Sequence, residues 1–230
     1  MNKYLRQIDF GSYGDDPFVN EIFTTETRWL FSALDDNLKT KVSSKCGKMN
    51  IRCCTPERFL NWLPDAAPDY VMSGVVLESG IGITGFIFDI KKYSQAATRA
   101  EKLDILYSIL QLAIKNFDPE AETDIEALQS VIDSVWNEQG EYIVETKKRF
   151  LNPSKTKRVR IRYVHDFDGV HVYGLVSDKP KGKETPIFTM TRPHGSRIDK
   201  AKIELDFLDD NNFTYRTVQR SFKRIHVTLP

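Results

Sequence analysis

The chain has no long hydrophobic run. Its longest apolar stretch, "ILYSILQLAI" at residues 105–114, has about half the length that a helix needs to cross a bilayer. The N-terminus, "MNKYLRQIDFGSYGDD", lacks the apolar segment of a secretory signal. We therefore expect a soluble cytoplasmic protein with no membrane partner.

Cysteine is also scarce. The chain has three cysteines, Cys46, Cys53 and Cys54. Adjacent cysteines cannot easily form a disulfide, and the six residues between the first two exceed the usual spacing of paired zinc ligands. We predict free thiols in a reducing compartment and no metal site.

Motifs for the common catalytic sites are missing. The sequence contains no phosphate-binding loop, no G-x-S-x-G and no H-E-x-x-H. Gly80, Gly82 and Gly85 match the spacing of the dinucleotide fingerprint, but "FIFDI" follows them where the fingerprint requires a helix. This segment predicts a hairpin turn and no bound cofactor.

The sequence has enough apolar residues for a real core. Of its 230 residues, 40% are hydrophobic and 28% are charged, which fits one large domain or two small ones. Residues 1–140 are predicted to be rich in helix, with strands at 49–54, 70–77 and 83–90. Helix starts are indicated at Asp16-Pro17 and Thr55-Pro56, and by capping boxes at Thr98/Glu101 and Thr123/Glu126.

From residue 141 the hydrophobic period changes to two, which is typical of strands. The predicted strands are 142–149, 157–165, 170–177, 186–191, 201–207 and 213–228. Short turn-like joins between them indicate antiparallel pairing. The predicted fold is α+β, with a helix-rich part (1–140) packed with a C-terminal antiparallel sheet (141–230). That sheet is a meander or a small barrel, and the two parts are possibly one continuous domain.

The hairpin at 157–177 has one apolar and one basic face. Pairing His165 with Val170 across the "DFDG" turn gives a core face made of Val159, Ile161, Tyr163, His165, Val170, Val172 and Val176. The opposite face carries Arg158, Arg160, Arg162, His171 and Tyr173. This second face must be solvated or covered by an anionic group.

Charge is divided along the chain. Residues 1–146 carry 14 Lys and Arg against 23 Asp and Glu, a formal charge of −9, and residues 147–230 carry 19 against 9, or +10. Residues 118–145 hold acids and no Lys or Arg. On the helix predicted there, the acids lie away from the apolar stripe, so they form an exposed acidic face.

These charges allow several interpretations. The preferred hypothesis is a non-enzymatic binding protein of the inhibitor or immunity type, which neutralises a protein partner such as a toxin or effector through a charged face. Its candidate residues are Glu122, Glu126 and Asp133 on the acidic face, and Arg158, Arg160, Arg162 and Tyr173 on the basic face.

Three alternatives stay open. The basic face could bind nucleic acid through its arginines, with stacking on Tyr173. A dispersed active site could form around His165, His171 and Asp168. Both charged faces could also be ordinary solvated surfaces, or could meet each other within the fold.

Overall fold

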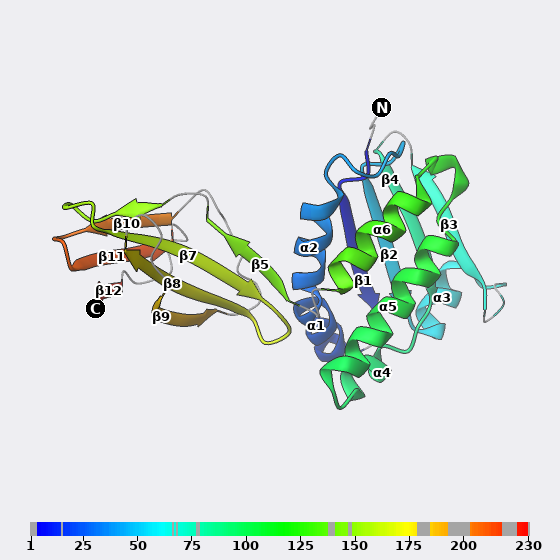
Figure 1. Cartoon of the computed structure of the whole chain (residues 1–230). Coiled ribbons are helices and arrows are strands. Elements are labelled where there is room, and N and C mark those ends of the chain that lie inside the picture. Colours follow the sequence, from blue (N-terminus) through cyan, green and yellow to red (C-terminus); the bar gives the residue numbers. More distant parts are fainter. Residues whose placement is uncertain are drawn as a thin grey trace. The chain divides into compact units, whose positions relative to one another are not determined.

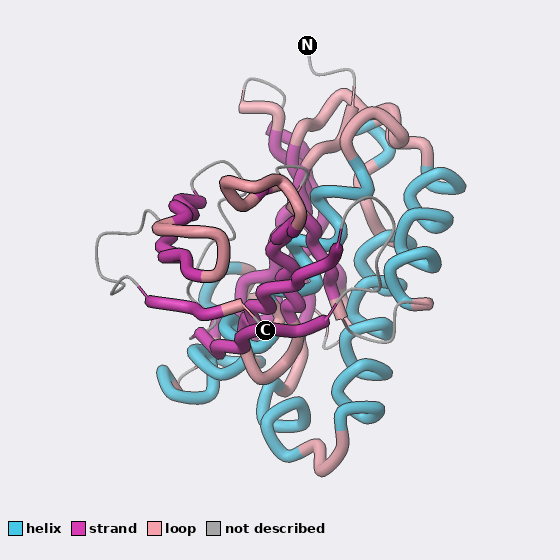
Figure 2. Tube along the Cα trace, turned by 60° about the vertical axis from the view of Figure 1, so that its left-hand side comes forward, coloured by secondary structure: helices cyan, strands magenta, loops and turns pink. Residues whose placement is uncertain are grey.

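A computed structural model describes residues 4–14, 16–65, 67, 69–76, 79–137, 141–146, 149–178, 185–192, 203–217 and 225–229. The chain divides into two compact units, Met1–Glu141 (unit 1) and Tyr142–Pro230 (unit 2). All described helices belong to unit 1, and the described residues of unit 2 form strands and loops. Figure 2 shows the helices and strands of the described chain by colour. This combination of helices with several sheets confirms the predicted α+β class.

Unit 1 is built on a four-stranded sheet with the strand order β1-β2-β4-β3. Three strands run parallel, β1 (Gln7–Tyr13), β2 (Lys48–Cys54) and β4 (Ile81–Ile87), and β3 (Val71–Val76) is antiparallel to β4. Alternate residues face the core. On β1 and β2 these are Ile8, Phe10, Met49 and Ile51, all at most 6% exposed.

Six α-helices complete unit 1. They are α1 (Pro17–Glu26), α2 (Arg28–Leu38), α3 (Pro56–Trp62), α4 (Ile90–Gln95), α5 (Arg99–Lys115) and α6 (Ile125–Trp136), with a 3-10 turn, η1 (Pro119–Ala121), before the last. In Figure 1, α2 lies beside β1, and α5 and α6 lie in front of the sheet. The apolar stripe of α6 is buried there, which leaves its polar side exposed.

Three of the four predicted helix starts are confirmed. Asp16 and Thr55 cap α1 and α3, and Thr98 with Glu101 forms a capping box on α5. The capping box at Thr123/Glu126 is wrong. Asp124 caps α6 by accepting from the backbone N–H of Ala127, because the Thr123 hydroxyl is hydrogen-bonded to Ser44 (2.8 Å) instead.

Unit 2 contains two antiparallel sheets. The first follows the order β5-β7-β8-β9, with β6 pairing beside β5 on β7, and the second follows β10-β11-β12. The strands are β5 (Tyr142–Glu145), β6 (Phe150–Leu151), β7 (Lys157–His165), β8 (Val170–Asp178), β9 (Thr185–Arg192), β10 (Ile203–Phe207), β11 (Asn212–Thr217) and β12 (Ile225–Thr228). No closed barrel forms among these strands, so the small-barrel alternative is wrong.

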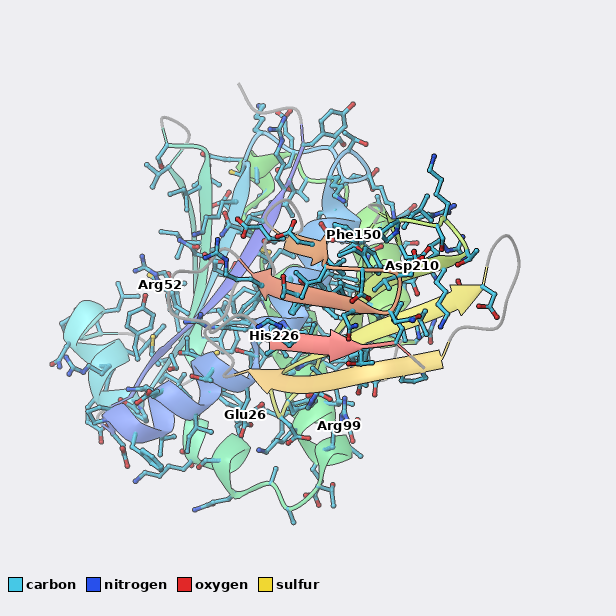
Figure 3. The ribbon with its side chains drawn as sticks, turned by 90° about the vertical axis from the view of Figure 1, so that its left-hand side faces the viewer. Glu26, Arg52, Arg99, Phe150, Asp210 and His226 are labelled. Carbon is cyan, nitrogen blue, oxygen red and sulfur yellow. The ribbon has the colours of Figure 1, made fainter. Side chains whose placement is uncertain are left out.

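Contacts join the two sheets of unit 2. The Tyr163 and Tyr215 hydroxyls lie 3.3 Å apart in the core, and β12 packs on β9. At one end, Asn152 donates to the backbone carbonyl of Asp210 (3.2 Å), at the turn between β10 and β11 labelled in Figure 3. The predicted register of the central hairpin is confirmed, because His165 pairs with Val170 and Val164 with His171.

Candidate functional site

The exposed side of α6 carries two of the predicted acidic residues. Leu128, Val131, Ile132 and Val135 face the core, which fixes the rotation of the helix. The opposite side, here called the α6 face, is formed by Glu126, Gln129, Ser130, Asp133, Ser134 and Asn137. These side chains line a shallow hollow of 600 Å³. The basic residues of unit 1 contribute nothing to this lining.

The two acids on the α6 face have no cationic partner among the described residues. Asp133 accepts hydrogen bonds from the Tyr107 hydroxyl (3.2 Å) and the Gln129 amide (2.8 Å), both neutral donors. Glu126 is exposed and has no ion pair or side-chain hydrogen bond within the described part of the chain. Desolvation, with the Asp133 bond, raises the pKa of Tyr107, so this hydroxyl stays a donor. The face therefore presents two uncompensated carboxylates.

Glu122 lies apart from the α6 face. It follows η1 in a left-handed conformation (φ 46°) and forms an ion pair with Lys45. This pair joins the loop before α6 to the loop before β2. Glu122 is thus compensated locally, unlike Glu126 and Asp133.

Sequence reasoning did not select Gln129, Ser130 or Asn137. Gln129 lies near Tyr107, whose ring packs 5.1 Å from Trp136. The helical spacing of Glu126, Ser130, Asp133 and Asn137 places them on one side of α6. The same spacing could have predicted from the sequence that these residues share one helix face.

The basic face of unit 2 has the predicted orientation. Arg158, Arg160 and Arg162 alternate with the buried residues of β7, and Tyr173 lies opposite Arg162 on β8. Leu175 and Ser177, opposite Arg160 and Arg158, are buried. Less of this face is therefore open than the alternating pattern indicated.

Glu145 compensates two of the arginines. Its carboxylate accepts from Arg160 Nη1 (3.0 Å) and from Arg162 Nε (2.9 Å) and Nη2 (2.5 Å). The sequence places Glu145 at the end of the acidic run, but β5 pairs it directly with Arg162. Arg158 has no acidic partner among the residues described, and its Nε is buried without a hydrogen bond.

The predicted histidine site is not assembled. His165 is 3% exposed on the core face of β7, while His171 lies on the outer face of β8. His171 Nε2 contacts Asp166 Oδ1 at 3.2 Å. Asp166 also accepts from the backbone N–H groups of Asp168 and Gly169 and so stabilises the turn. Asp168 itself is exposed, and it takes part in this turn through its backbone N–H.

The cysteines are buried and free. Desolvation raises the pKa of Cys46 and Cys53, and it raises that of Cys54 to about 11, so these thiols are protonated at neutral pH and weakly nucleophilic. In the described ranges no cluster of three or more His, Cys, Asp or Glu side chains is placed to hold a metal ion.

No helix in the described portion of the chain is long and apolar enough to cross a membrane. Comparisons with models of protein families, with curated proteins and with solved structures found no match to this chain.

Proposed function

We propose that this protein is a non-enzymatic binding protein of the inhibitor or immunity type, and that its α6 face binds a basic surface of a protein partner. One observation carries the proposal. Glu126 and Asp133 are exposed on one helix face, and neither is paired with a cation in the residues described. The partner would be a toxin or effector with clustered Lys or Arg side chains.

The hydrogen bonds on the α6 face suit this role. Tyr107 and Gln129 hold the Asp133 carboxylate from one side while it stays exposed. A carboxylate held in this way loses less side-chain entropy when a partner binds. Ser130, Ser134 and Asn137 add neutral donors and acceptors around it.

The basic face supports a binding role less well. Glu145 offsets the charge of Arg160 and Arg162 on the same sheet, which reduces the attraction for a polyanion. Nucleic-acid binding by this face is therefore the competing outcome of the test below. An active site near His165 and His171 has less support, because these side chains lie on opposite faces of the sheet.

The proposed location is the cytoplasm. Three free, buried thiols suit a compartment that keeps cysteines reduced. The inhibitor would meet its partner there and associate quickly, since opposite charges steer the encounter.

The test is an affinity capture from nuclease-treated lysate of the source cells. The wild type is compared with Glu126→Lys/Asp133→Lys and with a control, Glu21→Lys/Glu120→Lys, which makes the same charge change at exposed acids of unit 1 outside the α6 face. We expect one basic protein to be retained by the wild type and the control. The α6 variant should bind it at least about tenfold more weakly.

Two results would count against the proposal. The first is equal retention of the captured protein by the α6 variant and the control variant. The second is that the nuclease-treated lysate yields no protein, while a parallel untreated lysate yields nucleic acid alone. If Arg158→Glu/Arg160→Glu/Arg162→Glu abolishes that capture, the basic face is favoured instead.

A further inference from the structure

The unit 1 sheet has one open edge. β3 is the last strand in its order and pairs only with β4. In an antiparallel pair, alternate residues direct their N–H and C=O groups away from the partner strand. The Val76 carbonyl accepts from Ser79 within the turn that leads to β4. The backbone groups of β3 that point away from β4 have no partner in the described chain. This edge is a row of unused donors and acceptors.

The opposite edge of the same sheet, at β1, is partly occupied by the chain itself. The backbone N–H of Ile8 on β1 donates to the Asp35 carboxylate of α2 (3.2 Å), and α1 and α2 both pack against β1. Tyr4, just before β1, forms an isolated bridge with Ser43. The two edges therefore differ: contacts within the chain occupy part of the β1 edge, whereas the described contacts leave the β3 edge open.

β3 lacks the features that usually protect an exposed edge. Its sequence, VMSGVV, has no charged residue and no proline, whereas natural edge strands commonly carry lysine, proline or a bulge. A Cβ added at Gly74 would meet no atom within 4 Å, so the middle of the strand is open. Val76 is 47% exposed.

An apolar pocket adjoins the start of β3. It has a volume of 290 Å³ and is lined by Leu63, Pro64, Asp65, Ala67 and Tyr70. Tyr70 directly precedes β3, and its ring centroid lies 6.3 Å from that of the buried Phe59. This space suits one large apolar side chain, and the Asp65 carboxylate at its rim favours a neighbouring positive charge.

We infer that β3 binds an extended segment of a protein partner, which adds to the sheet as a fifth strand. The segment would be uncharged over about six residues, matching β3. At the end beside Tyr70 it would place a large apolar side chain in the pocket, with a Lys or Arg next to Asp65. This inference does not depend on the α6 proposal, because the two surfaces share no residue.

A flexible segment fits this edge better than a second copy of the chain. Two paired six-residue strands bury on the order of a few hundred Å², less than the roughly 1,000 Å² of a stable interface between folded proteins. Such a pair would also give Asp65 no cation, since β3 itself carries no basic residue. An extended peptide would both fill the pocket and form hydrogen bonds with the outward backbone groups of β3.

The experiment measures binding of a fluorescent probe peptide to the full-length protein. The probe alternates threonine and valine over six residues and ends in leucine and lysine. Its control has the same sequence with alternate amides N-methylated, which removes the donors of the ladder. Val76→Lys blocks the edge, and Val76→Thr is the matched variant that keeps a β-branched, uncharged residue.

We expect the probe to bind the wild type and Val76→Thr, and to protect the amides of β3 from hydrogen exchange. N-methylation and Val76→Lys should each weaken binding by about tenfold or more. Lack of binding, equal binding of the N-methylated probe, or protection elsewhere in the chain would overturn the inference. Self-association in sedimentation that Val76→Lys abolishes would also overturn it, because the occupant would then be a second copy.

Discussion

Asp35 is a half-buried carboxylate that binds a backbone group of the sheet. It accepts the Ile8 N–H at the β1 edge of the unit 1 sheet. Desolvation raises its pKa from 3.8 to about 6, and the negative charges of Asp9 and Asp36 add to the rise, while the Ile8 hydrogen bond and Lys48 act in the opposite direction. The folded state therefore holds the Asp35 proton more tightly than the unfolded state does.

This shift predicts a pH dependence of stability. The contribution of Asp35 is fully present below pH 3.8 and is lost as the pH rises through about 6. Asp35→Asn keeps an oxygen acceptor for Ile8 without the charge. Allowing for solvent access, it should raise the free energy of unfolding by about 1–2 kcal/mol at pH 7.5 and change it little at pH 4. Urea denaturation at both pH values checks this, and equal destabilisation at both would refute it.

Glu145 sets the charge of the basic face. Glu145→Gln should change stability by less than about 1 kcal/mol, because its ion pairs are partly exposed. It frees two arginines, so we expect elution from a heparin column at higher salt than the wild type. Asp168→Asn makes the same charge change at an exposed turn of unit 2 and is the control. Equal elution of the two variants would show that Glu145 does not mask the arginines.

Gly82 in the unit 1 sheet leaves room for the ring of Phe117, which follows α5. A Cβ on Gly82 of β4 would lie 2.4 Å from the ring of Phe117, which is 7% exposed, whereas one on Gly74 of β3 meets open space. Gly82→Ala should therefore destabilise the protein by about 1–3 kcal/mol. Gly74→Ala should be neutral or stabilise it by roughly 0.5 kcal/mol. Thermal unfolding distinguishes them, and similar losses would contradict this packing.

Elements with a strong local signal were predictable from the sequence. The period of two from residue 141 located the strands of the central hairpin and both of its faces, because side chains alternate across a sheet. The caps Asp16, Thr55 and Thr98 were visible because their side chains bond to nearby backbone. The predicted cap at Thr123 does not form, because its hydroxyl is hydrogen-bonded to Ser44, which is far away in the sequence.

Features that depend on long-range pairing were not predictable in this way. β1 reads "QIDFGSY", with a glycine and few apolar residues, and it is a strand because it pairs with β2 and packs on α2. The same holds for Glu145, whose role follows from the register of β5 on β7. In the candidate site, the positions of Glu126 and Asp133 followed from helical spacing, but the Lys45 partner of Glu122 did not.

At the scale of the whole molecule, charge follows the division into two units. Unit 1 carries 14 Lys and Arg against 22 Asp and Glu, or −8, and unit 2 carries 19 against 10, or +9. Within unit 2 part of the charge is compensated, as at Glu145, whereas the α6 face of unit 1 stays uncompensated. The proposed partner-binding surface is therefore on unit 1.

Site-specific photo-crosslinking in source cells tests this claim most directly. A photoreactive residue is placed at Ser130, in the middle of the α6 face, and separately at Glu21, an exposed position on α1. The account predicts a covalent adduct with one basic protein from Ser130, absent from Glu21 and lost when Glu126 and Asp133 are changed to lysine. No adduct from Ser130, or the same adduct from both positions, would contradict it.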